Sequence, residues 1–346
     1  MKHLIKPITR REFLAASSAG TLALTIGFAN PGRAQSVITM RISSSMSADQ
    51  NAAHYIWYER FAANLKTGLG DRVTLGYFPD SQLGKEADIV QQVKVGSVDM
   101  MITGSSIWAT VAPEFGMLDL GYVFDSYPHC FKALDGGVGD QLGKILNDRT
   151  GCTVLDWASH FGPRSVYTKM LVKNLAELKG VKLRVLPAPA FIETFKIMGA
   201  IPTPIPINEL YTALQTGVVD GFEHDQASVL QYKFAEQVKY CWLTEHLFSP
   251  MVAVIGKRGM DKLPADAKPA FLKAARDATV YERGVAAEKG KAAMEELKKM
   301  GVTFTPMAKA EREQVRKEME ARVWAPFIKE YPVTKPMFEA IAAARA

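Results

Sequence analysis

Two arginines, Arg164 and Arg184, are the residues of this sequence whose type and position best suit ligand binding. Arg184 lies on the polar face of an alternating segment, residues 181–185, and Arg164 follows a predicted strand that ends near Trp157. A guanidinium carries a planar fork of N–H donors that matches the two oxygens of a carboxylate. Spacing alone also allows each arginine to be a solvated surface charge or a partner in an intramolecular ion pair. Carboxylate binding is therefore one of the open interpretations.

Catalytic and metal-binding motifs are absent from the sequence. It contains no G-x-S-x-G, H-E-x-x-H, P-loop or dinucleotide-binding fingerprint. No two of the six histidines are spaced three or four residues apart, which excludes a helical metal pair, and we expect each to be a surface or hydrogen-bonded structural residue. The three cysteines permit a Cys130–Cys152 disulfide or buried free thiols. The missing motifs make the common enzyme classes less favoured without excluding an enzyme, and the sequence assigns no catalytic residue, no metal and no cofactor.

The positive charge of the chain is concentrated at its N-terminus. The formal net charge is +6, but five of the 42 basic residues and one of the 36 acidic residues lie in residues 1–34, which leaves about +2 for the rest. Residues 1–34 combine Arg10-Arg11, an apolar run and small residues before Ala34, a pattern typical of a cleaved twin-arginine export signal. This composition predicts a periplasmic protein without a nucleic-acid partner or stable membrane insertion.

Strand and helix patterns alternate along the sequence. A first group predicts a parallel sheet covered by helices, with strands at 38–42, 73–78 and 99–103 and helices at 53–65 and 86–95. A second group has strands at 181–185 and 218–223, an extended segment at 201–206, and helices at 190–198 and 209–215. Two such α/β units leave a cleft, and open α/β sheets bind ligands beyond the carboxyl ends of their strands. Ser44, Arg184 and the residues after Phe222 lie near such ends.

The C-terminal third predicts a return to both units. Residues 252–257 read as a strand that rejoins one sheet, residues 264–300 as a long helical stretch, and residues 309–345 as further amphipathic helices. We therefore predict an α/β fold with two lobes, a ligand cleft between them and a long helix that spans both. The predicted divisions are 35–160 for the first lobe, 161–246 for the second, and 247–346 for a returning segment that contributes to both.

Several sequence blocks closely resemble the DctP-type solute-binding proteins of TRAP transporters. The most specific are Leu178–Val185 (LKGVKLRV), Gly199-Ala200 followed by prolines 202, 204 and 206, and Glu209–Gly221 (ELYTALQTGVVDG). Two earlier blocks, Gln82–Glu86 and Val95–Met100, are similar to further family motifs. The resemblance covers essentially the whole chain after the export signal. It implies a monomeric two-lobed periplasmic binding protein, not an enzyme, that captures a small organic acid and delivers it to a sodium-driven permease.

The resemblance also assigns roles to individual residues. It implies that Arg184 is the main carboxylate anchor and Arg164 a second one, with the segment from Phe222 to Asp225 completing the site. Where many members have an asparagine, this chain has His224, which can also donate a hydrogen bond to a carboxylate or signal a different ligand group. The remaining candidate contacts are Ser44 at a strand end and the possible pocket walls Phe222, Trp108 and Tyr211.

Three alternatives remain open at this stage. Glu223 and Asp225 permit a cation that bridges to the ligand, or recognition of a ligand without a carboxylate. Glu223 and His224 permit a periplasmic enzyme that uses them as acid and base on a small carboxylate. His224 also permits a purely structural role next to Glu223. The sequence does not identify the acid.

Overall fold

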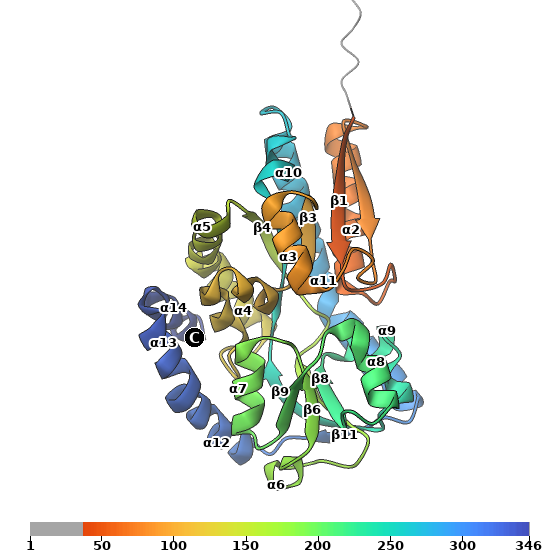
Figure 1. Cartoon of the computed structure of the whole chain (residues 1–346), viewed down its shortest axis with the longest axis vertical. Helices are drawn as coiled ribbons and strands as arrows, with labels where there is room; N and C mark the ends of the chain where they lie inside the picture. The colour runs from red at the N-terminus through yellow and green to blue at the C-terminus, as the bar shows by residue number, and fades with distance from the viewer. Residues whose placement is uncertain (1–36, 346) are drawn as a thin grey trace, which may run out of the picture. The chain divides into compact units, whose positions relative to one another are not determined.

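The computed structural model of the protein describes residues 37–345, so the predicted export signal at 1–34 lies outside the described residues. Eleven strands form two sheets in this part of the chain (Figure 1). The strands are β1 (Ile38–Ser44), β2 (Val73–Phe78), β3 (Met100–Gly104), β4 (Thr153–Ser159), β5 (Arg164–Thr168), β6 (Lys182–Val185), β7 (Ile201–Pro204), β8 (Gly221–His224), β9 (Tyr240–Leu247), β10 (Pro250–Ile255) and β11 (Thr303–Pro306).

Helices connect and cover these strands. The α-helices are α2 (Ala53–Leu69), α3 (Glu86–Val95), α4 (Tyr127–Ala133), α5 (Gly139–Thr150), α6 (Leu175–Leu178), α7 (Pro189–Ile197), α8 (Ile207–Gln215), α9 (Gln226–Gln231), α10 (Lys257–Asp261), α11 (Lys268–Lys299), α12 (Lys309–Met319), α13 (Ala325–Glu330) and α14 (Lys335–Ala343). The short helical segments are η1 (Ser105–Thr110), η2 (Pro113–Asp119), η3 (Leu134–Val138), η4 (Phe234–Glu236), η5 (Glu320–Trp324) and η6 (Pro332–Thr334).

Each sheet contains one strand that runs against the others. The first sheet has the order β2-β1-β3-β10-β4, with β10 antiparallel to both of its neighbours. The second has the order β11-β9-β5-β8-β6-β7, with β5 antiparallel to both of its neighbours. The prediction of parallel pairing is confirmed for β1, β2 and β3, but the sheets as a whole are mixed.

The antiparallel strands are those at which the chain crosses between the sheets. The chain passes directly from β4 in the first sheet to β5 in the second, and later from β9 in the second to β10 in the first. No helix intervenes at either crossing, so the entering strand runs opposite to its new neighbours. As a result, the carboxyl ends of the parallel strands face the same region as the start of β5 and the start of β10.

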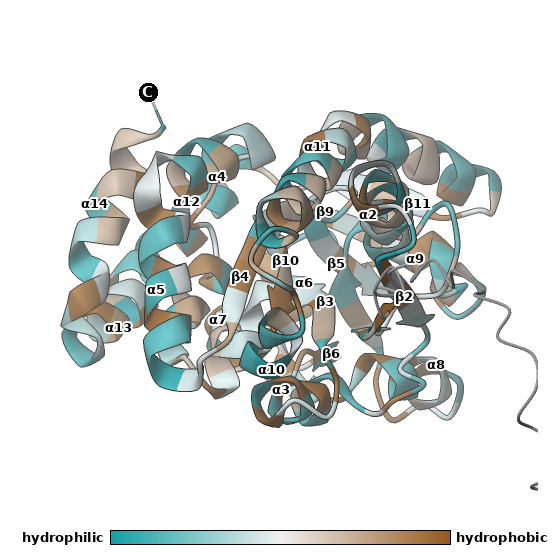
Figure 2. Ribbon diagram, turned by 90° about the horizontal axis from the view of Figure 1, so that it is seen from above, coloured by the Kyte–Doolittle hydropathy of each residue, from teal (hydrophilic) through white to brown (hydrophobic). Residues whose placement is uncertain are grey.

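Both sheets are buried between helices. Apolar side chains of α2 and α11 pack on one face of the first sheet, and those of α3, η1, η2, α4 and α5 on the other. The second sheet is covered by α7, α12 and η5 on one face and by α8, α9 and η4 on the other. Figure 2 shows hydrophobic residues on strands such as β4 and hydrophilic residues on the surrounding helices. This arrangement confirms the predicted α/β fold with two lobes, each built on one sheet.

The 32-residue helix α11 connects the two lobes, as the sequence predicts. It packs against α2 and β4 of the first lobe and against α9 of the second. The indole Nε1 of Trp57 donates a hydrogen bond of 2.9 Å to the hydroxyl of Thr279, which fixes α2 on α11. The buried carboxylate of Glu282 accepts hydrogen bonds from the backbone N–H (3.0 Å) and the hydroxyl (2.9 Å) of Ser159, at the end of β4. Glu282 therefore anchors α11 where the chain leaves the first lobe.

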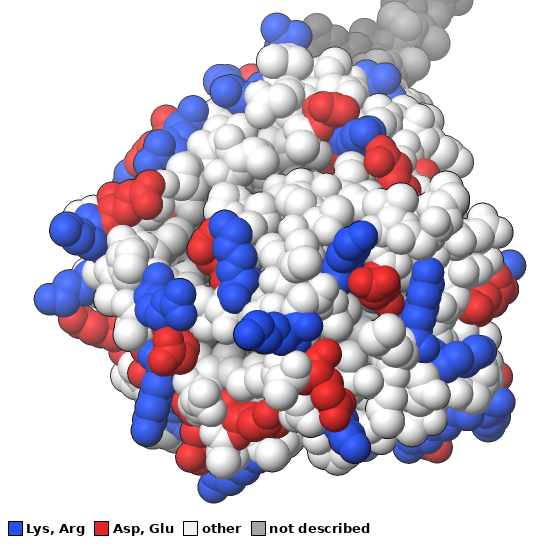
Figure 3. Space-filling model, turned by 60° about the horizontal axis from the view of Figure 1, so that its bottom comes forward, with Lys and Arg blue, Asp and Glu red and all other residues white. Residues whose placement is uncertain are grey.

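Acidic and basic side chains are interspersed on the surface shown in Figure 3. No large area of one sign is visible on that face, which agrees with the small net charge of the chain after residue 34. Within residues 37–345, no helix combines the length and the hydropathy needed to cross a bilayer. Cys130, Cys152 and Cys241 are all buried free thiols.

Candidate functional site

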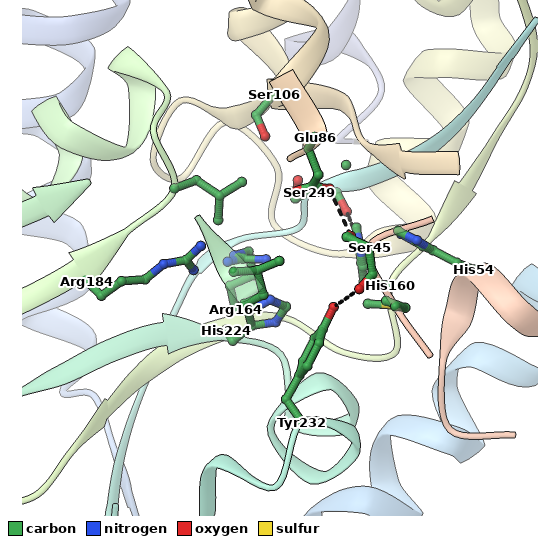
Figure 4. Close-up of a pocket in the computed structure, with 14 residues that line it drawn as sticks. Ser45, His54, Glu86, Ser106, His160, Arg164, Arg184, His224, Tyr232 and Ser249 are labelled. Carbon is green, nitrogen blue, oxygen red and sulfur yellow. Dashed lines mark hydrogen bonds between the residues drawn. The ribbon is translucent and has the colours of Figure 1, made fainter. Parts of the chain in front are cut away.

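A small pocket of about 30 Å³ lies where strand ends of the two sheets meet (Figure 4). The first lobe contributes residues that follow β1, β3 and β4, together with the first turns of α2 and α3. The second lobe contributes residues of β5, β6 and β8, the first residue of α8 and the residue that follows α9. The lining residues are Ser45, Met46, His54, Glu86, Gly104, Ser106, His160, Arg164, Arg184, Leu186, Ile207, His224, Tyr232 and Ser249.

Arg184, in β6, is a fully buried cation with unused hydrogen-bond donors. Its Nε donates to the backbone oxygen of Ile205 at 2.7 Å. Its terminal nitrogens, Nη1 and Nη2, are buried without a hydrogen-bond partner among the described residues. Burial lowers the pKa of Arg184 to about 10, against the favourable charge of Glu223 and with the unfavourable charge of Arg164. The pocket therefore contains a guanidinium fork that lacks an anion.

Arg164, at the start of β5, is by contrast paired. Its Nε and Nη2 donate to the two carboxylate oxygens of Glu223 at 2.6 and 2.7 Å, and Nη2 also donates to the Glu223 backbone oxygen at 3.1 Å. Burial alone would raise the pKa of Glu223, but the charge of Arg164 and the hydrogen bonds from His246 and Arg164 together outweigh burial and lower this pKa to about 2. His246 Nε2 lies 3.4 Å from Glu223 Oε2 on the other side. The pair lines the pocket through Arg164 and fixes the orientation of that side chain.

Three histidines line the pocket. His54 Nδ1 lies 2.9 Å from Ser44 Oγ, His160 Nδ1 lies 3.2 Å from the Ser249 backbone oxygen, and His224 Nδ1 lies 2.8 Å from Asp225 Oδ2. Burial is the largest cause that lowers the pKa of all three, to about 4 for His224. The three imidazoles are therefore neutral at neutral pH.

Two of these histidines, His54 and His160, were not predicted as site residues. His160 directly follows β4, so its position at the carboxyl end of a strand was a usable signal. His54 is the second residue of α2, and its contact with Ser44 follows from the tight connection after β1. Both side chains are buried and hydrogen-bonded, as expected of structural histidines, and both also line the pocket.

The other predicted site residues fall into two groups. Ser44, Glu223 and Asp225 are buried behind the pocket and contact His54, Arg164 and His224 respectively. Asp225 also caps α9 by accepting hydrogen bonds from the backbone N–H and hydroxyl of Ser228. The side chains outside the pocket lining are Phe222, stacked on Tyr167 with ring centroids 5.4 Å apart, Trp108, in the core of the first lobe, and Tyr211, whose hydroxyl donates to Glu236.

Direct hydrogen bonds join the two lobes at the pocket rim. The hydroxyl of Tyr232, in the second lobe, donates to the Ser45 backbone oxygen at 2.8 Å. The amide of Gln231 donates to the Ser47 hydroxyl at 3.0 Å. Farther out, Lys85 Nζ and Glu209 Oε1 form an ion pair of 2.6 Å between α8 and the residue before α3. These contacts bring α9 and α8 against the first lobe.

No cluster of three or more His, Cys, Asp or Glu side chains suited to a metal ion occurs within residues 37–345. The polar groups of the pocket are instead two guanidinium groups, three neutral imidazoles, the Glu86 carboxylate and several hydroxyls. Two α/β lobes that enclose a buried cation, unpaired among the described residues, between their strand ends form a site suited to binding a small anionic solute.

Comparison with known proteins identifies the family. Residues 44–330 match DctP, described as bacterial extracellular solute-binding protein, family 7. The chain belongs to this family of TRAP periplasmic solute-binding proteins. It is 30% identical over 321 residues to the 2,3-diketo-L-gulonate-binding periplasmic protein YiaO of Escherichia coli K12, covering 93% of this chain and 97% of that protein.

Solved structures show the same fold. A TRAP periplasmic solute-binding protein of Xanthobacter autotrophicus Py2 with bound β-D-galacturonate superposes with a TM-score of 0.81 at 27% identity, covering 88% of this chain and 99% of that chain. A second, from Polaromonas sp. JS666 and bound to D-erythronate, has a TM-score of 0.81 at 29% identity, covering 89% and 98%. Members of the family are binding proteins, and these two contain acids of the sugar-acid type.

Proposed function

We propose that this protein is the periplasmic receptor of a TRAP transporter and that it binds a small organic acid through Arg184. The observation that carries this proposal is the pair of buried terminal nitrogens of Arg184, which have no hydrogen-bond partner in the described residues and belong to a residue that lines the pocket. A carboxylate supplies two oxygens with the spacing of this fork and the charge that the cation lacks. The acids bound by the relatives support the same ligand class.

Arg164 has a different role in this proposal. Its charge is balanced by Glu223, and Nε and Nη2 are already used. It therefore contributes a positioned donor and a positive potential rather than a second unpaired charge. The same pairing argues against catalysis by Glu223, since a carboxylate bound by two guanidinium N–H groups with a pKa near 2 is a poor general base. We propose that the bound acid leaves chemically unchanged.

Lobe movement is required for the ligand to enter. The pocket measures only about 30 Å³, and hydrogen bonds between the lobes cross its rim, so an acid of four or more carbon atoms can enter only when the lobes part. The direct β4–β5 and β9–β10 crossings are the natural hinge segments, because they join the lobes without an intervening helix. We propose that residues 35–160, 161–246 and 247–346 form the first lobe, the second lobe and the returning segment.

The remaining parts of the proposal concern cellular context. Residues 1–34 direct export by the twin-arginine route, the receptor acts as a periplasmic monomer, and it transfers the acid to a membrane permease. Recovery of the protein from the periplasm only when Arg10 and Arg11 are intact tests the route. Light scattering of the purified receptor tests the monomer.

The binding proposal is tested with protein purified from the periplasm of expressing cells. Thermal shift and calorimetry are measured against small organic acids, each paired with its neutral amide. We expect an acid to raise the Tm while its amide does not, because a ligand that binds only the folded state stabilises it. Mass spectrometry of the released ligand should return the acid unchanged.

Variants of Arg184 make the test specific. Arg184→Ala removes two charge-assisted hydrogen bonds of about 1.5–3 kcal/mol each, so binding should weaken by roughly 100-fold or more. Arg184→Lys should also weaken binding, because an ammonium cannot reproduce the planar fork. Tyr211→Phe, remote from the pocket lining, is the control and should bind normally. Near-native affinity of Arg184→Ala would overturn the assignment of the anchor.

A further inference from the structure

Three of the four hydroxyl groups that line the pocket donate hydrogen bonds to other groups of the protein. Tyr232 Oη donates to the Ser45 backbone oxygen at 2.8 Å, and Ser45 Oγ donates to Glu86 Oε1 at 3.0 Å. Ser249 Oγ donates to the buried carboxylate of Asp119. A hydroxyl has a single proton, so each of these oxygens can face a ligand only through its lone pairs. Three hydroxyls of the lining are therefore hydrogen-bond acceptors toward the pocket.

The protein partners of two imidazoles assign the same role to them. His160 Nδ1 lies 3.2 Å from the Ser249 backbone oxygen, which only accepts, so the proton of the neutral ring is on Nδ1. His224 Nδ1 lies 2.8 Å from Asp225 Oδ2, and an unprotonated nitrogen there would place two lone pairs against each other. The Asp225 backbone N–H, 3.0 Å from the same nitrogen, cannot donate to it in this tautomer, so the assignment rests on the stronger attraction of the N–H to the Asp225 carboxylate. The Nε2 atoms of both rings are left unprotonated.

Glu86 adds a charged acceptor to this set. Its Oε1 accepts hydrogen bonds from Ser45 Oγ and, at 2.6 Å, from Thr103 Oγ1. Its Oε2 has no hydrogen-bond donor among residues 37–345. Figure 4 shows Glu86 and His160 across the pocket from Arg184. Ser106 Oγ and His54 Nε2 are buried without a partner among the described residues and can take either role. Apart from the arginines, the fixed polar groups of the pocket are thus acceptors.

We propose that this pocket selects a monocarboxylate whose other polar groups are hydrogen-bond donors, that is, a polyhydroxylated acid, and that Glu86, His160 and His224 determine this selection. The inference rests on the proposed function, because Arg184 holds the single carboxylate. A second carboxylate meets lone pairs and the negative charge of Glu86. A deoxy acid leaves the buried acceptors without donors, and such unpaired groups strongly reject an analogue that lacks the hydroxyls.

The test is calorimetric titration of the periplasmic protein with acids matched in chain length. The hydroxylated acids are D-erythronate, D-gluconate, D-galactonate, D-glucuronate and D-galacturonate. The matched analogues are butanoate and hexanoate, which lack hydroxyls, and succinate and adipate, which add a carboxylate. We expect at least one hydroxylated acid to bind 100-fold or more tightly than every matched analogue.

The outcomes separate this inference from the proposed function. If an analogue without hydroxyls, or a dicarboxylate, binds as tightly as the best hydroxylated acid, the selection is overturned while the carboxylate receptor stands. If no acid of any kind binds, the proposed function itself fails, and this inference with it. Binding restricted to hydroxylated monocarboxylates supports both.

A substitution on α3 tests the acceptor wall directly. Glu86→Gln replaces a charged acceptor with an amide that also donates, so the preference for the hydroxylated acid over succinate or adipate should fall by at least tenfold. Asp88→Asn makes the same change of charge on an exposed side chain of the same helix and should leave the preference unchanged. Equal effects of the two variants would show a long-range charge effect and overturn the role of Glu86. Circular dichroism of both variants checks that they are folded.

Discussion

The buried charge of Arg184 should destabilise the ligand-free fold, although the same charge is necessary for binding. Burial lowers the pKa of the Arg184 guanidinium well below the usual value, to about 10. A shift of one unit corresponds to about 1.4 kcal/mol, so the charged form destabilises the ligand-free fold by about 3 kcal/mol at any pH below that value. Arg184→Met removes the charge and keeps a long flexible side chain. It also loses the hydrogen bond to the Ile205 backbone oxygen, worth about 1 kcal/mol.

The net expectation for Arg184→Met is a gain of about 2 kcal/mol in the free energy of unfolding. For a chain of this size the Tm should rise by roughly 4 °C or more. The assay is urea and thermal unfolding of the ligand-free protein at pH 7, next to calorimetry, in which acid binding should be lost. A Tm equal to or below that of the wild type would refute the reasoning, because it would mean that the buried guanidinium is satisfied by the protein itself.

Arg164→Met is the matched control for this experiment. It removes the same side chain from a neighbouring position, but it leaves the buried Glu223 carboxylate without its partner. Breaking a buried pair from one side typically costs about 3–5 kcal/mol. We expect this variant to be strongly destabilised, so the two arginine variants should move the Tm in opposite directions.

Two further predictions follow from buried and interlobe charges. Burial raises the pKa of Glu282 to about 8, so the protonated form is favoured in the fold, and stability should decrease from pH 5 to pH 8 by on the order of 4 kcal/mol; in Glu282→Gln this decrease should be absent in urea unfolding at the two pH values. Glu209→Gln breaks the half-exposed ion pair with Lys85, so acid affinity should fall by a few-fold at most at low salt, with no difference from wild type at high salt.

Local patterns predicted many elements closely. The strand at residues 73–78 and the helix at 86–95 match β2 and α3, because each has its own apolar periodicity and a clear end signal. The helix expected at residues 53–65 corresponds to α2, which continues to Leu69 and ends at Gly70, whose φ is positive. Strand β5 was missed, since all of its residues are buried and it shows no alternation.

The site was predictable only in part, for a physical reason. The positions of Arg164, Arg184 and His224 near strand ends could be read from the sequence, and the family resemblance gave them roles. Which arginine is paired could not be read from the sequence, because pairing depends on which carboxylate lies nearby in the fold. Glu223 is 59 residues from Arg164 and forms a bidentate pair with it. The strand end before His160 was a usable signal, but the direct crossing from β4 to β5, which brings His160 to the second lobe, has no local signature.

The contacts between the lobes have a kinetic consequence. The hydroxyl of Tyr232, directly after α9, and the amide of Gln231, in α9, donate hydrogen bonds to Ser45 and Ser47 of the first lobe. These hydrogen bonds lie outside the carboxylate fork. A ligand enclosed in so small a space can leave only when these contacts break, so its dissociation rate equals the frequency of lobe opening multiplied by the chance of escape before reclosure. Residence time is then set partly by hydrogen bonds between the lobes, such as that of Gln231 with Ser47, whose residues do not line the pocket. Substitutions at the pocket rim can therefore change the residence time of the ligand, while the contacts that recognise the ligand stay the same.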